Sequence, residues 1–538
     1  MKISSQILIY GLFAMLMAGC SKNILEENSP SIILADNLYK NKVGFEAGIN
    51  GLYYEVRRSR SGYTPGDING MMLVPAYIGT DNAYGNYLGP ASSFNIWGVS
   101  NNSTLGEYRL EWAWLYETIN AANTIIKRAE NPAVIWTEAE KNVVLAEARA
   151  IRAWCYRHLT FSWGDVPLVL IESSGSDIRT DYERTPVAEV RNAMEADWLF
   201  AEQYLPVTSA NQGKLLKGAV QHYLSELYLT IGKNDKARDY ALKVTTNINY
   251  KLVTARYGAN AAKPGTTFTD MFLEGNSNRN QGNTEALWVM QAELNTIGGE
   301  PDNVMRRYWV NRYYSLVVGG KSPFLVSAEN GGRGIGRFGP TKWALSIYPA
   351  GDDRGSDFAW RFSFAINNPT GVPAGYTLGQ TYNLDRTTNE KANNPNWPST
   401  RKWDYASPVD PNIDRAYNDQ IYIRAAETYL LLAEAYLKLG DQVNAAIAIN
   451  ALRSRAHAPT ITPNQVTLDF ILDERSRELF SEEERRYTLV RTGKFVERVK
   501  LYNVLSKATI SDRDALLPIP QNVIDANLTK ILPQNPGY

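Results

Sequence analysis

Two segments that lie far apart in the chain repeat one pattern. They read SELYLTIGKNDKARDYAL from Ser225 and AEAYLKLGDQVNAAIAIN from Ala433. Both carry Glu, Tyr, Leu, Gly and Ala at identical spacing, at positions 226, 228, 229, 232 and 237 and again at 434, 436, 437, 440 and 445. The glycine permits the left-handed conformation that ends a helix, and an alanine five residues later lets a returning helix approach closely. The pattern predicts a helical hairpin at each place, as in tetratricopeptide repeats.

Helical hairpins of this kind cannot bury their apolar faces alone, so we expect at least about three or four of them to stack. The segment 107–129 has helical periodicity and is ended by Asn131-Pro132, with its apolar face formed by Leu110, Trp114, Ile119, Ala122 and Ile126. A second helix opens at Thr137, where Glu140 completes a capping box, and ends before Gly164. The sequence therefore predicts an all-α, tetratricopeptide-like scaffold over residues 37–60, 106–252 and 419–538.

Two regions, 61–105 and 254–418, interrupt this scaffold. They are rich in Gly, Asn, Pro, Trp and Tyr and show little helical periodicity. Long irregular loops inside a compact fold are uncommon and tend to be functional. We expect both regions to be large binding loops carried on the helical frame.

The amino-acid composition restricts the classes of ligand and macromolecule that the protein is expected to bind. Lys and Arg together number 56, as do Asp and Glu, so no net field favours nucleic acid, and a neutral or weakly charged ligand is the easier fit. The three histidines stand alone and supply no zinc site. Cys155 lies on the apolar line of a helix and is expected to be a buried structural thiol. We therefore expect no metal, no cofactor and no nucleic-acid partner.

Two motifs in region 254–418 resemble sequence patterns of known functional sites. GIGRFG, at 334–339, matches a dinucleotide-binding pattern but lacks the preceding strand and following helix, so we expect a mobile loop in which Arg333 and Arg337 can meet a polar ligand. GDDRGSD contains Asp352, Asp353 and Asp357, which leaves a glycoside hydrolase open as an alternative, although the spacing of carboxylates across a sugar cannot be read from sequence.

Aromatic residues in the irregular regions are the main candidates for ligand contact. Trp97 lies in FNIWGVSNNS, Trp309 precedes Tyr313 and Tyr314 in RRYWVNRYYS, and Trp343 lies in PTKWALS. A flat ring offers apolar contact to the C–H face of a sugar, and ring stacking on aromatic side chains contributes about 1 to 3 kcal/mol. The alternative for each ring is that it packs its loop onto the scaffold.

The N-terminus has the features of an export signal. Lys2 is followed by an apolar run at 7–17 that is too short to cross a hydrocarbon core of about 30 Å. The stretch LMAGC, ending at Cys20, resembles the lipobox of bacterial lipoproteins. We expect residues 1–19 to be a signal peptide, Cys20 to be lipidated, and residues 20–36 to form a leash; a secreted protein with a chance cysteine is the alternative.

Four longer motifs resemble those of the SusD/RagB family of outer-membrane nutrient-binding lipoproteins. They are LAEARAIRAWCYRHLTFSWGDVPLVL, IYIRAAETYLLLAEAYLKLG, ERSRELFSEEERRYTLVRTGK and LLPIPQNVIDANLTKILPQNPGY. Where family members usually read FFEGHRWFDLVR, this chain has Glu483 at the glycine and Thr488 at the aspartate.

The resemblance implies a single SusD-like domain over 37–538, held at the outer surface of the outer membrane by lipid. It implies no catalysis and a partnership with a SusC-like TonB-dependent transporter that takes up captured oligosaccharide. A peptide-binding member of the family and a surface glycoside hydrolase stay open as alternatives. The family's sugar platform is built from loop aromatics, which makes the expected glycan-binding residues Trp97, Trp309, Tyr313, Trp343, Tyr84, Asp81, Asn101 and Arg337.

Overall fold

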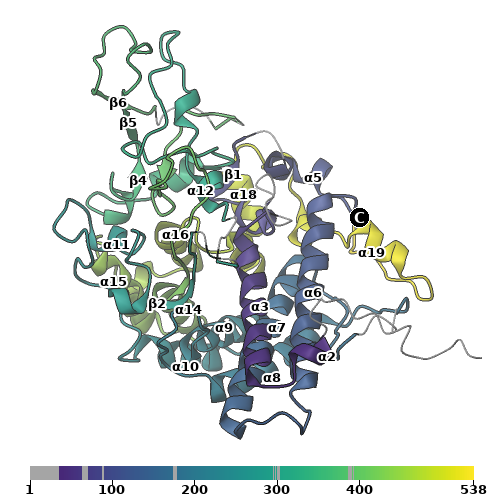
Figure 1. The fold of residues 1–538 in the computed structure, drawn as a ribbon. Helices are drawn as coiled ribbons and strands as arrows, with labels where there is room; N and C mark the ends of the chain where they lie inside the picture. The colour runs from purple at the N-terminus through teal and green to yellow at the C-terminus, as the bar shows by residue number, and fades with distance from the viewer. Residues whose placement is uncertain are drawn as a thin grey trace, which may run out of the picture.

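The computed structural model describes residues 35–62, 71–87, 90–173, 179–294, 296, 298–299, 303–385, 390–391 and 393–538. The predicted signal peptide and Cys20 lie outside these residues. Helices form most of the regular structure (Figure 1). Those of the scaffold are α2 (Ala35–Leu38), α3 (Lys42–Arg57), α6 (Gly106–Arg128), α7 (Glu138–Trp163), α8 (Val187–Tyr204), α9 (Lys217–Thr230), α10 (Asn234–Thr245), α14 (Ala425–Lys438), α15 (Gln442–Arg455), α16 (Leu468–Leu479), α17 (Arg485–Arg491), α18 (Phe495–Tyr502) and α19 (Gln521–Ala526).

Successive scaffold helices pack on one another. Helix α6 packs on α7, α7 on α8, α8 on α9 and α9 on α10. Helix α14 continues the stack by packing on α10, although the 254–418 region separates the two in the chain, and α15 packs on α14. Figure 1 shows α9, α10 and α14 close together in the lower half of the molecule. The arrangement confirms the predicted scaffold of stacked helical hairpins.

The two repeated segments have the same local structure. Gly232 and Gly440 have φ angles of 74° and 79°, the left-handed conformation that ends α9 and α14. Ala237 and Ala445, five residues later, have no exposed surface. The close approach of the returning helices α10 and α15 therefore requires the small side chain that the repeat provides.

The repeated glutamates are held in buried ion pairs. Arg157 donates to both carboxylate oxygens of Glu226, and Arg491 donates to those of Glu434 at 2.5 and 2.6 Å. Burial alone would raise the pKa of each carboxyl, but the facing arginine outweighs it and lowers each pKa to about 2. Each hairpin is thus tied to a helix outside its own pair.

The two irregular regions contain only short elements. Their helices are α4 (Val74–Tyr77), α5 (Trp97–Ser100), α11 (Thr267–Asp270), α12 (Met305–Trp309) and α13 (Lys342–Ser346). Within the described residues, four antiparallel two-stranded sheets pair β1 (Ala83–Gly85) with β3 (Phe338–Pro340), β2 (Ala286–Met290) with β8 (Gln420–Arg424), β4 (Trp360–Arg361) with β7 (Ser399–Thr400), and β5 (Ser363–Ala365) with β6 (Thr381–Asn383). The β1–β3 pair joins the two irregular regions, and β2–β8 joins the second region to the start of α14.

One hydrophobic core extends through the scaffold and into both irregular regions. It includes Phe45, Trp97, Trp154, Trp309 and Leu517. Cys155 is fully buried in it, as predicted, and burial raises the pKa of its thiol. Among the helices of the described residues, none combines the length and the apolar character needed to cross a bilayer.

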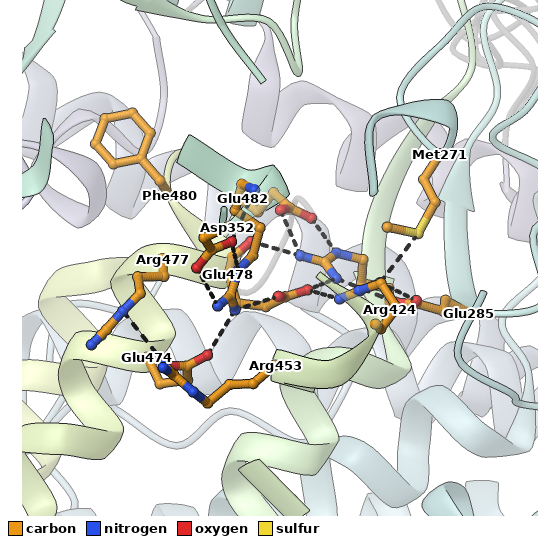
Figure 2. Close-up of polar contacts among 12 residues, drawn as sticks. Met271, Glu285, Asp352, Arg424, Arg453, Glu474, Arg477, Glu478, Phe480 and Glu482 are labelled. Atoms are coloured by element: carbon orange, nitrogen blue, oxygen red, sulfur yellow. Dashed lines mark hydrogen bonds and ion pairs between the residues drawn. The ribbon is translucent and has the colours of Figure 1, made fainter. Parts of the chain in front are cut away.

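A network of buried charges lies beside this core. Glu478 accepts hydrogen bonds from Arg354, Arg424 and Arg455, with the first two at 3.0 and 2.5 Å. Figure 2 shows this network, whose further charged members include Glu285, Asp352, Arg453, Glu474 and Glu482. Lys402 joins it by donating to the Glu478 carbonyl at 2.8 Å. Buried charges are tolerated where each has partners. The charged segment ERSRELFSEEERR, at 474–486, therefore forms part of the interior and not a solvated helix face.

Candidate functional site

The structure buries the aromatic residues that the sequence analysis placed at the ligand surface of region 61–105. Trp97 has no exposed surface; its indole donates to the Gly79 carbonyl at 3.0 Å and packs edge-on against Phe94 and Phe495. Tyr84 also has no exposed surface, because its β1 strand is covered by β3. The prediction that these two rings face solvent is wrong, and the alternative that they pack the loop onto the scaffold is correct.

The same correction applies to the second irregular region. Trp309 is buried between Phe338 and Phe480, at ring-centroid distances of 5.0 and 5.2 Å. Tyr313 is buried and stacks on Phe364 at 4.4 Å. Neither ring has a face that a sugar can reach in this conformation.

The polar residues expected beside these rings are also internal. Asp81 accepts from Arg485 and Arg498 at 2.7 to 2.8 Å; burial would raise its pKa, but the two arginines outweigh burial and lower it. Asn101 donates to Asp514 at 2.8 Å. Both residues are buried and anchor region 61–105 to the C-terminal scaffold, so their expected role as direct sugar ligands is wrong.

Trp343 is the expected platform residue that stays half-exposed. It stacks on Tyr502 with ring centroids 4.4 Å apart, and the Arg498 guanidinium lies 4.9 Å from its centroid. These contacts join α13 to α18, and the role of Trp343 in glycan binding stays a prediction.

The GIGRFG motif is an ordered, buried connection and not the expected mobile loop. Its last residues form β3, which pairs with β1 so that Tyr84 faces Gly339. A Cβ at Gly334 would lie 2.1 Å from the Val310 carbonyl oxygen, and one at Gly339 would lie 2.8 Å from the Tyr84 ring. Gly334 is therefore required for close packing within region 254–418, and Gly339 for close packing between the two irregular regions.

Two tyrosines near the predicted ones form a half-exposed surface instead. Tyr87 follows β1 in region 61–105, and Tyr314 follows the buried Tyr313 in region 254–418. Arg312 donates to the Tyr87 hydroxyl at 2.7 Å, and its guanidinium carbon lies 5.0 Å from the Tyr87 ring centroid. Arg333 donates to the Tyr314 hydroxyl at 3.4 Å. We call the surface formed by Tyr87, Arg312, Tyr314, Arg333 and Arg337 the arginine–tyrosine face.

This face is held from below by buried groups. The Tyr314 ring packs edge-on against Tyr313 at 5.7 Å, and Tyr313 in turn stacks on Phe364. The backbone of Arg333 is fixed at both of its polar atoms, because its N–H donates to the Pro411 carbonyl at 2.9 Å and its carbonyl accepts from Arg306 at 3.1 Å. Burial lowers the pKa of the Arg306 guanidinium to about 10. The Tyr314 ring and the backbone of Arg333 are therefore held in place by the protein itself, before any ligand binds.

Tyr87 is not among the glycan-binding residues that the sequence predicts, and Tyr314 appears only as part of the RRYWVNRYYS motif. Arg337, which the sequence does predict, lies at this face: its side chain is largely buried, with the guanidinium carbon 5.2 Å from the Tyr87 ring centroid. Tyr87 stands three residues from Tyr84, and Tyr314 stands next to Tyr313. Strand alternation around β1 is the one sequence signal that separates Tyr84 from Tyr87, since residues an odd number apart face opposite sides.

Two carboxylates of GDDRGSD have partners within the protein, one in the interior and one at the surface. Asp352 is buried and accepts from Arg354 at 2.8 and 2.9 Å. Asp353 contacts His457 at 2.8 Å. Within the part of the chain that the structure describes, no group of three or more His, Cys, Asp or Glu side chains is arranged to hold a metal ion.

Comparisons with family models, with related sequences and with solved structures all lead to the same protein family. A model of the SusD family matches residues 255–538, and a second, described as starch-binding associating with outer membrane, matches residues 79–229. SusD-like protein P2 of Formosa agariphila is 25% identical, and the alignment covers 97% of each chain. A laminarin binding SusD-like protein of solved structure has a TM-score of 0.70 at 23% identity, covering 93% of this chain and 100% of its own.

Surface glycan-binding protein A from Bacteroides thetaiotaomicron, solved in complex with laminarihexaose, has a TM-score of 0.70 at 18% identity and covers 92% of this chain and 99% of its own. The two solved structures share the fold of stacked helical hairpins that carry irregular regions. Because the family match covers more than half of the residues, the chain belongs to the SusD family.

Proposed function

We propose that this protein binds a glycan reversibly at the arginine–tyrosine face. The observation that carries the proposal is the position of Tyr87 and Tyr314, half-exposed rings that come from the two irregular regions and are each hydrogen-bonded by an arginine. A tyrosine ring offers apolar contact to a sugar, and guanidinium groups donate hydrogen bonds to its oxygens. The laminarin-binding and laminarihexaose-bound relatives carry out glycan binding on the same fold.

We further propose that the protein is a lipoprotein of the outer membrane, held by lipid on Cys20 at the cell surface, and that it passes the glycan to a SusC-like TonB-dependent transporter. The lipobox-like LMAGC stretch supports the anchor. The family description that names association with the outer membrane supports the location. One acyl chain binds a membrane only reversibly, so stable attachment needs more than one chain on the cysteine.

Changing Cys20 to alanine is expected to release the protein from the membrane fraction, because the substitution removes the proposed attachment point. Cell fractionation followed by immunoblotting measures the distribution. Ser21→Ala, one residue away, is the matched control and is expected to leave the protein in the membrane. Retention of the Cys20 variant in the membrane fraction would contradict lipid anchoring at this residue.

The contacts of the GDDRGSD carboxylates favour a protein that binds the glycan without hydrolysing it. Asp352 and Asp353 of the GDDRGSD segment are occupied by Arg354 and His457, so they do not form the free pair that a glycosidase needs. A peptide ligand is the other alternative. Both alternatives have a direct readout: release of reducing ends from a glycan shows a hydrolase, and binding of peptides in place of glycans shows a peptide-binding member.

Tyr314→Ala and Tyr87→Ala are each expected to weaken glycan binding by about 1 to 3 kcal/mol, because each removes a ring on which the sugar packs. Isothermal titration calorimetry or affinity electrophoresis against a panel of polysaccharides measures the change.

Tyr240→Ala is the matched control, since Tyr240 is a half-exposed tyrosine on α10 of the scaffold. Circular dichroism establishes that all three variants are folded. If both face variants bind as tightly as the wild type, the arginine–tyrosine face is not the binding site.

A further inference from the structure

The charge of the arginine–tyrosine face differs from that of the chain as a whole. The chain carries equal numbers of basic and acidic residues. At this face, however, the guanidinium carbons of Arg312 and Arg333 each lie 5.9 Å from the centroid of the Tyr314 ring. Arg312 and Arg337 also lie over Tyr87, at 5.0 and 5.2 Å. Three cationic groups are therefore gathered around two rings that belong to different irregular regions.

Two of these arginines have hydrogen-bond donors left over. Arg312 uses Nη1 on the Tyr87 hydroxyl, while its Nε is buried and has no acceptor. Arg333 uses Nε on the Tyr314 hydroxyl. Within the described parts of the chain, Nη2 of Arg312 and both Nη atoms of Arg333 donate to no protein acceptor. A planar guanidinium with free donors is suited to paired hydrogen bonds with an anionic group.

No carboxylate among the described residues forms an ion pair with either of these two arginines. Asp414 forms its ion pair with Arg307, and Asp410 accepts from Asn412 at 2.9 Å. The hydrogen bond to Tyr314 raises the pKa of the Arg333 guanidinium, and Asp414 and Asp410 add to this from a distance. Of the carboxylates that the structure describes, none lies within 4.0 Å of the nitrogens of Arg312 or Arg333. Within the described residues, the charge of Arg333 is thus offset only in part by Asp410 and Asp414, and the donors of Arg312 and Arg333 are not used by an ion pair.

We propose that the ligand of this face is an acidic glycan, whose carboxylate or sulfate groups bind Arg312 and Arg333 while a sugar ring packs on Tyr314. The inference rests on the proposed glycan-binding function and adds the chemical class of the sugar. An acidic ligand takes the place of the neutral or weakly charged one expected from the net charge of the chain. A bound group at hydrogen-bonding distance responds to the charges beside it and not to the total charge of the chain.

The test compares polymers that differ only in charge. The wild-type protein is titrated with polygalacturonate and its methyl-esterified form, with a sulfated carrageenan and its desulfated form, and with laminarin as a neutral glucan. At least one charged polymer is expected to bind about tenfold or more tightly than its neutral counterpart, because hydrogen bonds to charged groups are stronger than neutral ones. The polyuronate arm and the sulfate arm show which anion is recognised. The preference is expected to shrink as salt is raised, since exposed charges are screened.

Substitutions then locate the preference. Arg312→Gln and Arg333→Gln are each expected to weaken binding of the preferred charged polymer by about tenfold and to weaken binding of its neutral form by a smaller factor, so that the charge preference shrinks. Arg109→Gln removes the same charge from an exposed position on α6 and is the matched control.

The outcomes separate the two proposals. Equal affinity for charged and neutral forms, with Tyr314→Ala still weakening both, overturns the acidic ligand and leaves glycan binding at this face standing. A charge preference that survives both arginine substitutions also overturns the assignment. Failure to bind the charged polymers, with binding of a neutral polysaccharide retained, overturns the acidic ligand alone, whereas failure to bind these five polymers and every polysaccharide of the panel contradicts the glycan-binding function as well.

Discussion

Replacing Glu478 by glutamine is expected to lower the free energy of unfolding by about 3 to 5 kcal/mol, because it leaves buried arginines without their counter-charge. Glu478 is fully buried and accepts from Arg354, Arg424 and Arg455. Burial alone would raise the pKa of this carboxyl, but the three arginines outweigh burial and hold it well below its ordinary value. Glutamine has nearly the same shape, so the loss reports the missing charge. Equilibrium unfolding in urea, followed by circular dichroism, measures it.

Glu130→Gln provides the control for this measurement. Glu130 pairs with Lys127 at 2.9 Å, with both side chains more than 60% exposed. Such surface pairs contribute about 0 to 1 kcal/mol, so the control variant should unfold close to the wild type. If the two glutamine variants unfold at the same denaturant concentration, the buried network does not hold the fold together.

Trp97→Ala is expected to lower the free energy of unfolding by about 3 to 5 kcal/mol, the usual range for removing a buried large aromatic side chain. Trp97 has no exposed surface, and its truncation leaves a cavity between Phe94 and Phe495 and an unpaired Gly79 carbonyl. A ring that served only as a sugar platform would instead lose ligand affinity without loss of stability. Thermal and denaturant unfolding of the ligand-free protein therefore distinguishes the two roles.

Trp343→Ala is the matched control, because Trp343 is an indole that stays half-exposed and stacks on Tyr502. Its removal is expected to reduce stability by about 0.5 to 1.5 kcal/mol, the range for one aromatic pair. A Trp97 variant as stable as the wild type would show that this ring is not part of the core.

The two departures from the family motif prove to be neighbours. The Thr488 hydroxyl donates to the Glu483 carboxylate at 3.1 Å, and the same carboxylate accepts from Arg475 and Arg485. In the motif that the chain resembles, position 488 corresponds to an aspartate, and here Glu483 places a carboxylate beside Thr488. The two departures, which the motif alone leaves unconnected, are therefore in contact in the structure.

The helical scaffold could be predicted because its signals are local. The glycines at 232 and 440, the capping box at Thr137 and Glu140, and the apolar periodicity of 107–129 each act within a few residues and were all found where expected. The longer motifs also indicated the protein family to which the chain belongs. Backbone hydrogen bonds and capping depend on sequence neighbours, so a single chain is enough to infer them.

The arginine–tyrosine face, by contrast, depends on contacts between residues far apart in the chain. Strand alternation predicts that Tyr84 and Tyr87 face opposite sides, but the packing of β3 on β1 decides which of the two is buried. For the neighbours Tyr313 and Tyr314, the stacking of Phe364 on Tyr313 decides it. The sequence alone therefore determined the stacked helical hairpins and the two loop regions that carry the site. The tertiary structure decided which side chains reach solvent, because burial depends on the elements that cover a residue and those elements come from distant parts of the chain.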